Sequence, residues 1–256
     1  MLILISPAKK LNLENNFDDI KDQLNEPIFI KTKTSKLIDS LKTKKTADFK
    51  KLMKLSDNLA QLNYQRYQEF KKSHSVKNSY PAVFTFDGDT YTGLQANKLN
   101  KSQLKKAQKQ LRILSGLYGI LKPLDLIQPY RLEMGTKYKI QDSKNLYEFW
   151  KKDITETINQ ELSEHKLLIN LASQEYFGAV ETKNITSPII TPVFKENKNG
   201  TYKIISFNAK KARGLMAYYI ITNNCKTVDD LKKFNLDGYK LNNKLSTENE
   251  PVFTRG

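Results

Sequence analysis

The first ten residues, MLILISPAKK (residues 1–10), give the strongest strand signal at the start of the chain. The largely apolar run Leu2–Ser6 ends at Pro7, which predicts a buried strand because proline cannot continue a ladder of backbone hydrogen bonds. The short loop that follows carries Lys9 and Lys10. A second apolar run, Lys166–Leu171, predicts another buried strand, so we expect a buried sheet in this protein.

Helical periodicity dominates several other segments. Between Lys31 and Phe70 three apolar stripes follow one another, which predicts three short helices. The stripes are Leu37, Ile38 and Leu41, then Phe49, Leu52 and Met53, then Leu59, Leu62, Tyr67 and Phe70. The same period predicts further helices over residues 101–111, 145–164, 207–220 and 228–234.

The remaining strand signals are short. Residues 82–86 predict a strand before Asp87-Gly88-Asp89, and residues 189–194 and 202–207 predict a hairpin around the turn pair Asn199-Gly200. Residues 114–135 mix Gly and Pro with apolar residues and predict a tightly packed irregular segment. No βαβ repeat emerges. We therefore expect an α+β fold with a mixed-sheet, barrel-like core and surrounding helices, in one domain over 1–256, with 31–70 as a helical insertion.

The charge of the chain has two readings. A net charge of +16 with pI ≈ 9.6 favours a polyanion partner, since lysines that neutralise phosphates release condensed counterions. A habit of the source genome, with lysine at any tolerant surface position, explains it too. The five arginines are more informative about a binding site, because lysine lacks the planar, fork-shaped guanidinium group. Of Arg66, Arg112, Arg131, Arg213 and Arg255, Arg131 and Arg213 lie in dense mixed motifs.

The cellular compartment is predicted from three features. The single Cys225 cannot form an intramolecular disulfide, and there is no basic-then-apolar leader. The longest apolar runs fall far short of the roughly 20 residues that a spanning helix needs. We expect a cytoplasmic protein without a membrane segment, and a monomer.

Metal and cofactor chemistry has few candidate residues. Two histidines, His74 and His165, and one cysteine are too few for zinc, haem or iron–sulfur sites, and both histidines lie in polar runs that predict surface positions. The same surroundings argue against a Ser-His-Asp or Cys-His nucleophile. No Gly-x-Gly-x-x-Gly or Walker loop follows a strand. The sequence predicts no metal site and no cofactor.

Four charged residues are candidates for catalysis or ligand binding. Asp87 and Asp89 could hold a hard cation or act in proton transfer, although a plain Asp-Gly-Asp turn is the favoured interpretation, since Gly88 serves a turn equally well. Arg131 and Glu133, in PYRLEMG (129–135), share one face of an extended segment. They fit a structural ion pair or a substrate clamp.

One stretch suggests DNA. LMKLSDNLA (52–60) aligns without gaps to the helix-hairpin-helix pattern L-x-G-I-G-x-x-x-A, whose hairpin amides grip a duplex phosphate without reading sequence. Lys54 and Ser56 stand where the two glycines belong. An ordinary pair of helices with Ser56 as N-cap explains the stretch as well.

Six ordered motifs run nearly from end to end of the chain. They are SPAKK (6–10), FDGDTYTGL (86–94), LSGLYGILKPLDLIQPYRLEMGTK (114–137), LYEFW (146–150), NLASQEYF (170–177) and KIISFNAKKARGLM (203–216). Together they resemble the YaaA peroxide-stress-resistance family. The resemblance implies a role in limiting free intracellular iron under peroxide. It also implies an unusual α+β fold that binds double-stranded DNA through a helix-hairpin-helix element and a positive cleft.

Two functions follow from these observations. The first is a DNA-binding stress protein that is not an enzyme and that contacts phosphates without strong sequence preference. Its predicted contacts are Lys9, Lys10, Lys54, Ser56, Lys210, Lys211 and Arg213. The alternative is an enzyme acting on a nucleotide, nucleobase or modified nucleic acid, with Asp87, Asp89, Arg131 and Glu133 as its candidate catalytic groups. The alternative predicts that Lys9, Asp89, Arg131, Glu133 and Lys211 converge on one concave pocket.

Overall fold

Strand β1 (Leu2–Ile5) forms the middle of the central sheet. The computed structural model describes residues 1–14 and 17–256 and orders this sheet β6-β5-β1-β8-β9. β1 is parallel to both β5 (Leu111–Ser115) and β8 (Leu168–Leu171), so that Ile3 lies between Leu111 and Ile169. All four β1 side chains are fully buried. Burial on both faces is typical of a parallel strand inside a covered sheet.

The helices and strands alternate irregularly along the chain. The helices are α1 (Ser35–Lys42), α2 (Thr46–Met53), α3 (Asp57–Glu69), α4 (Ala82–Thr85), α5 (Asp89–Leu94), α6 (Lys101–Gln110), α7 (Leu146–Leu162), α8 (Gln174–Phe177), α9 (Ser206–Thr222) and α10 (Val228–Lys232). The other strands are β2 (Lys10–Leu11), β3 (Tyr80–Pro81), β4 (Phe86–Asp87), β6 (Gly119–Leu121), β7 (Leu126–Ile127), β9 (Ile189–Ile190), β10 (Val193–Lys198), β11 (Thr201–Lys203), β12 (Lys240–Leu241) and β13 (Val252–Arg255). A π-helical turn, Ile30–Thr34, precedes α1, and short 3-10 turns occur at Asp18–Gln23, Ala96–Lys98, Thr182–Asn184 and Leu236–Gly238.

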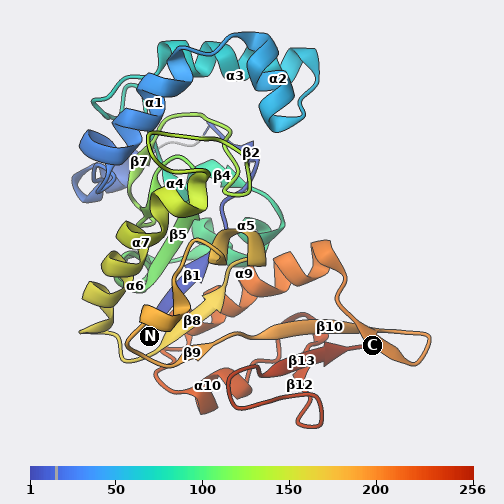
Figure 1. Ribbon diagram of the computed structural model, residues 1–256. Helices are drawn as coiled ribbons and strands as arrows, with labels where there is room; N and C mark the ends of the chain where they lie inside the picture. The colour runs from blue at the N-terminus through green and yellow to red at the C-terminus, as the bar shows by residue number, and fades with distance from the viewer. Residues whose placement is uncertain (15–16) are drawn as a thin grey trace.

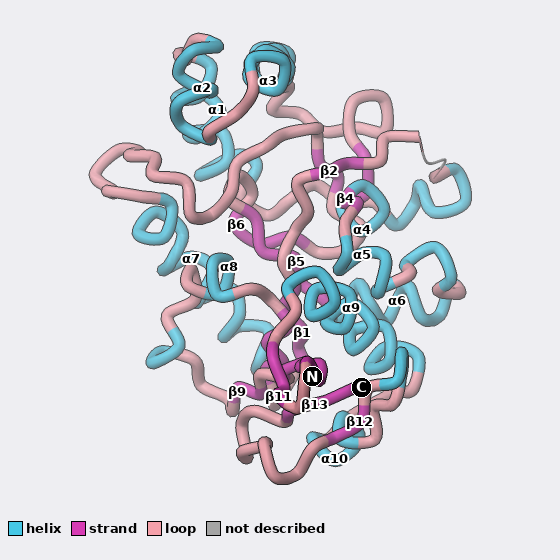
Figure 2. Tube along the Cα trace, turned by 90° about the vertical axis from the view of Figure 1, so that its right-hand side faces the viewer, coloured by secondary structure: helices cyan, strands magenta, loops and turns pink. Residues whose placement is uncertain are grey.

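Three tiers are visible in Figure 1. Helices α1, α2 and α3 form the top tier, which agrees with the three helices predicted between residues 31 and 70. The central sheet lies in the middle, and a second sheet, ordered β11-β10-β13-β12, lies at the bottom. Helix α9 runs beside the central sheet, with α5 next to it in both views (Figures 1 and 2).

The α+β prediction is confirmed, with two changes of detail. In the part of the chain that the structure describes, the sheets are open and none closes into a barrel. Residues 82–85, predicted as strand, form the short helix α4, in which the Phe86 amide donates to the Ala82 carbonyl and the Thr85 hydroxyl donates to the Pro81 carbonyl. A short apolar run does not distinguish the two structures.

The predicted hairpin is confirmed at its turn, but both arms differ from the predicted segments. Residues 189–190 form β9 of the central sheet, and the first arm is β10. β10 and β11 pair around Asn199-Gly200, whose φ values of 53° and 80° are those of a tight left-handed turn. The second arm stops at Lys203, and α9 begins at Ser206. Helix α9 therefore starts about a turn before Lys210.

Two glycines let α5 and α9 cross almost backbone to backbone. A β-carbon on Gly93 would lie 2.1 Å from the carbonyl oxygen of Lys211, and one on Gly214 would lie 1.8 Å from that of Thr90. Real side chains cannot occupy such positions, so glycine is required at both places. The crossing fixes Arg213, next to Gly214, close to the first turn of α5, which carries Asp89.

The segment 114–135 is tightly packed, as predicted. The Trp150 indole donates a hydrogen bond to the Gly116 carbonyl at 2.9 Å, and Tyr118 is fully buried. His74 lies against this segment, with its Nε2 3.0 Å from the Tyr118 hydroxyl. His74 is only 7% exposed, so its predicted surface position is wrong. Phe70 and Tyr118 cover the imidazole, a contact that its polar sequence neighbours do not reveal.

Within residues 1–14 and 17–256, every helix is too short or too polar to span a membrane. The single domain over 1–256 and the insertion over 31–70 remain predictions.

Candidate functional site

The carboxyl ends of β1 and β8 meet at one edge of the central sheet. Ser6, which follows β1, accepts the amide of Ser173 at 2.9 Å, and Ser173 follows β8. β1 has its parallel neighbours on opposite sides, β5 and β8. Connections that leave a strand in opposite directions open a crevice outside its carboxyl end, where ligands bind in sheets of this kind.

A cavity of about 300 Å³, which we call the inner pocket, lies at this edge. The loop after β1, the turn before α5, and helices α8 and α9 supply most of its wall. The charged and aromatic side chains in the wall are Lys9, Lys10, Asp87, Asp89, Tyr91, Glu133, Glu175, Tyr176, Lys210 and Arg213. Opposite charges from at least five chain segments therefore converge on one small cavity.

Several of these charges neutralise one another. Lys10 pairs with Asp87 at 2.6 Å. Glu133 accepts both Lys9 and Arg131, each at 3.1 Å, and its side chain is only 15% exposed. Glu133 therefore holds two cations at once, and Arg131 and Glu133 form an ion pair at the edge of the cavity, while the substrate clamp stays a prediction.

Three charged groups of the inner pocket stay without a partner. Among the described residues, no ion pair or hydrogen bond is formed by the side chains of Asp89, Lys210 or Arg213. Burial lowers the pKa of the Arg213 guanidinium, which stays charged because arginine titrates far above neutral pH. A half-buried cation without a counter-charge is costly, so Arg213 favours an anionic ligand in the inner pocket.

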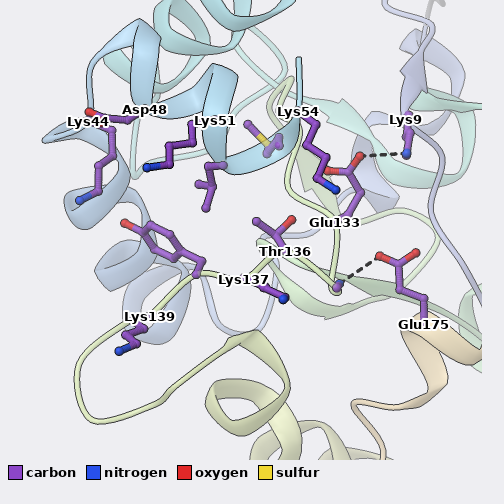
Figure 3. A pocket seen from close by; sticks show the side chains of 14 residues that line it. Lys9, Lys44, Asp48, Lys51, Lys54, Glu133, Thr136, Lys137, Lys139 and Glu175 are labelled. Atoms are coloured by element: carbon purple, nitrogen blue, oxygen red, sulfur yellow. Dashed lines mark hydrogen bonds and ion pairs between the residues drawn. The ribbon is translucent and has the colours of Figure 1, made fainter.

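A second, wider cavity of about 820 Å³ adjoins the first, and we call it the outer hollow. Besides Lys9, its lysines come from two separate parts of the chain, the α1–α2 region and the loop after β7. They are Lys44, Lys51, Lys54, Lys137 and Lys139, and Figure 3 shows them around the opening. None of the five forms an ion pair with a described residue. The two cavities share Lys9, Glu133 and Glu175, which makes them neighbouring parts of one site.

Comparison with known proteins identifies the family. The family model described as peroxide stress protein YaaA matches residues 1–245. The chain belongs to this family. Membership of the peroxide stress protein YaaA family supports a peroxide-stress role for this chain.

Relatives of the YaaA family protein span its full length. A UPF0246 protein of Marinomonas sp. (strain MWYL1) is 54% identical, with 100% of this chain and 97% of the relative covered. A UPF0246 protein of Flavobacterium johnsoniae is 52% identical, with both chains covered completely. A third, of Idiomarina loihiensis, is 48% identical over 100% of this chain and 98% of its own.

Most of the predicted contacts of this YaaA family member gather at the two cavities. Lys9, Lys10, Lys210 and Arg213 line the inner pocket and Lys54 lines the outer hollow. Lys211 lies outside both and pairs with Asp237 at 3.3 Å. Of the residues expected to converge in an enzyme, Lys9, Asp89 and Glu133 line the inner pocket, Arg131 joins it through Glu133, and Lys211 does not.

The helix-hairpin-helix detail is not confirmed for this member of the YaaA family. Helices α2 and α3 do meet at a short turn, with Lys54 in the left-handed conformation (φ 53°) that glycine adopts easily. The amides of Lys54 and Leu55 both donate to the Lys50 carbonyl, so they are not free for a phosphate. Ser56 caps α3 by accepting the Leu59 amide, as the plainer interpretation predicts.

Four lysines of the outer hollow were missed from the sequence. Lys44 and Lys51 lie on the predicted helical segment, and Lys137 ends the longest family motif. Lys139 follows two residues later. In a chain so rich in lysine, no local pattern separates these from solvated surface lysines. Only the folded chain brings α2 and residues 137–139 to the same opening.

Proposed function

We propose that this member of the YaaA family protects against peroxide stress by binding double-stranded DNA in the outer hollow. The observation that carries the proposal is the set of five lysines there without ion pairs, drawn from two segments of the chain. Their charge is available for phosphates, and neutralising phosphates releases counterions from DNA. In the proposal the chain acts as a cytoplasmic monomer.

The proposed binding has little sequence preference. All the cations that line the outer hollow are lysines. Lysine contacts a phosphate as a point charge, whereas arginine is the side chain best suited to pair with a guanine edge. Binding of this kind positions the protein along the duplex without reading the bases.

The effect on free iron is indirect in this proposal. Across the described residues, no group of three or more His, Cys, Asp or Glu side chains is arranged to hold a metal ion. The proposal therefore assigns no iron ligand to this chain and places protection at the DNA.

Two matched triple variants test the proposal by fluorescence anisotropy on a labelled duplex. Lys51, Lys137 and Lys139 replaced together by Ala remove three exposed charges from the outer hollow. Lys101, Lys105 and Lys109 replaced together by Ala remove the same charge from α6, on other surface. The first variant should lose more than about tenfold in affinity and the second much less. Equal losses, or no duplex binding by the parent chain at low salt, reject the proposal.

A second candidate function is an enzyme acting on a nucleotide, nucleobase or modified nucleic acid. The observation that favours it is the convergence of Asp87, Asp89 and Glu133 with four cations on the inner pocket. Carboxylates and cations side by side can move a proton and stabilise a developing charge. Incubation with nucleotides and with duplex DNA, followed by mass spectrometry, would reveal a product that Asp89→Asn fails to make. Absence of any product removes this candidate.

A further inference from the structure

We propose that the inner pocket binds one nucleotide 5′-phosphate unit, either a free mononucleotide or an unpaired nucleotide of a strand held in the outer hollow. This inference rests on the proposed function, because the outer hollow supplies the argument for a nucleic-acid ligand. It assigns a ligand class to a cavity whose charged groups duplex binding alone does not require.

The phosphate end of the ligand is assigned to Arg213 and Lys210. Both lie on α9, three residues apart, so they project from one side of the helix. Lys210 is exposed and Arg213 is half-buried, and neither has a partner among the described side chains. The arginine guanidinium can bind a phosphate through two parallel hydrogen bonds, and the lysine ammonium adds a point charge.

The remainder of the ligand must carry hydrogen-bond donors. Asp89 is an unpartnered acceptor in the same cavity, within the described chain. The α5–α9 crossing brings Thr90 against Gly214, the neighbours of Asp89 and Arg213, yet these two opposite charges form no ion pair. Lys9 and Lys10 in the same wall do have carboxylate partners. A ligand with an anionic end and an amino or hydroxyl group satisfies both free groups.

The size and walls of the inner pocket suit a single nucleotide. Its volume of about 300 Å³ is at the lower end of the range for small-molecule sites, roughly 300–1,000 Å³. Tyr91 and Tyr176, both largely buried, line its wall, and aromatic side chains are those on which a base stacks. A duplex cannot enter this space, whereas one nucleotide unstacked from its strand can.

Continuity with the outer hollow decides between a nucleotide and other phosphate compounds. Lys9 and Glu133 line both cavities. A strand whose phosphates follow the lysines of the outer hollow therefore passes the mouth of the inner pocket. The structure thus places a one-nucleotide pocket beside a surface suited to a polyanion.

Calorimetric titration with 5′-dAMP, 5′-dGMP, 5′-dCMP and 5′-TMP, with inorganic phosphate beside them, tests the pocket directly. At least one mononucleotide should bind, and Arg213→Met should weaken it by about tenfold or more, since a charge-assisted contact is lost. Lys211→Met is the matched control on the same helix, because Lys211 pairs with Asp237 outside the pocket. Phosphate binding as tight as the nucleotide, or an equal loss in both variants, overturns the assignment.

A second arm distinguishes the two sources of the ligand. A duplex with a single unpaired nucleotide should bind several-fold tighter than its fully paired counterpart, and Arg213→Met should remove that difference. If only free mononucleotides respond to Arg213→Met, the source is a soluble nucleotide. The Lys51, Lys137 and Lys139 to Ala variant should lose duplex binding while mononucleotide binding stays unchanged. If the parent chain binds mononucleotides but no duplex, the result counts against the proposed function only. If it binds the duplex but no mononucleotide, the result counts against this inference only.

Discussion

The α-carbon of Gly214 on α9 lies so close to Thr90 on α5 that a β-carbon there would be 1.8 Å from the Thr90 carbonyl oxygen. Backbone contact of this kind holds two helices at one separation, because no side chain lies between them to adjust. Arg213 and Asp89, two of the three charged groups of the inner pocket that have no partner among the described residues, are the chain neighbours of these two residues. The pocket is therefore as rigid as the helix crossing.

Replacing Gly214 by Ala should destabilise the protein. In an ordinary helix interior this change stabilises by about 1 kcal/mol, but here the added methyl must push α5 and α9 apart, at a cost of about 1–3 kcal/mol or more. Urea unfolding, monitored by circular dichroism, measures whether the free energy of unfolding falls or rises in the variant. A variant more stable than the parent would show that the two helices are not in contact at Gly214.

His74 should make stability depend on acidic pH. Burial lowers its pKa from 6.5 to about 4, so the folded chain keeps it neutral while the unfolded chain protonates it. Stability is then lost as pH falls from 6.5 towards 4, on the order of 3 kcal/mol in all. His74→Gln should flatten this part of the stability curve measured by chemical denaturation. An unchanged slope in the variant argues against a buried neutral imidazole.

Asp125 should act in the opposite direction. Burial raises its pKa from 3.8 to about 7, while the Lys122 amide, a donor at 2.8 Å, opposes part of that rise. Between about pH 4 and pH 7 the folded chain holds a proton that the unfolded chain releases, so this carboxyl lowers stability as pH rises. Asp125→Asn should gain stability over the parent between pH 5 and pH 8, by a few kcal/mol at most. A variant that instead loses stability at pH 8 would indicate an ionised carboxylate with a favourable partner.

Glu133 should oppose DNA binding. Its carboxylate neutralises Lys9 and Arg131 at the boundary between the two cavities. Glu133→Gln frees both cations and should raise duplex affinity a few-fold at low salt. Asp237→Asn is the matched control, because Asp237 also holds two cations, Lys211 and Arg255, but lies away from both cavities. Weaker binding by Glu133→Gln would mean that the carboxylate is needed to position Lys9.

The elements with long periodic or uniformly apolar patterns could be predicted from the sequence. β1, β8, α6 and α7 agree with their predicted segments to within a few residues. β5 is not predicted by the sequence, because LRILS (111–115) follows the amphipathic α6 without a break. Its first residue falls at the end of the predicted helix 101–111 and its last two at the start of the predicted irregular segment 114–135. The side-by-side position of β5 and β1 is a long-range pairing that no local pattern encodes.

The candidate site was only partly predictable for a similar reason. Lys9, Lys10, Asp89 and Arg213 stood out because they lie in dense motifs, and the structure brings all four to the inner pocket. The pairing of Lys211 with Asp237, 26 residues further along the chain, could not be read from the sequence. The same holds for the outer hollow. Its two groups of lysines, at residues 44–54 and 137–139, are separated by more than 80 residues in the sequence and come together only in the folded chain.

The salt dependence of duplex binding tests the central claim most directly. The logarithm of the binding constant should fall linearly with the logarithm of salt concentration, with a slope of about −0.9 for each phosphate neutralised. The variant with Lys51, Lys137 and Lys139 replaced by Ala should show a slope smaller in magnitude by roughly 3, whereas the α6 control should keep nearly the parent slope. A parent slope near zero, or an equal reduction in both variants, would contradict binding of DNA in the outer hollow.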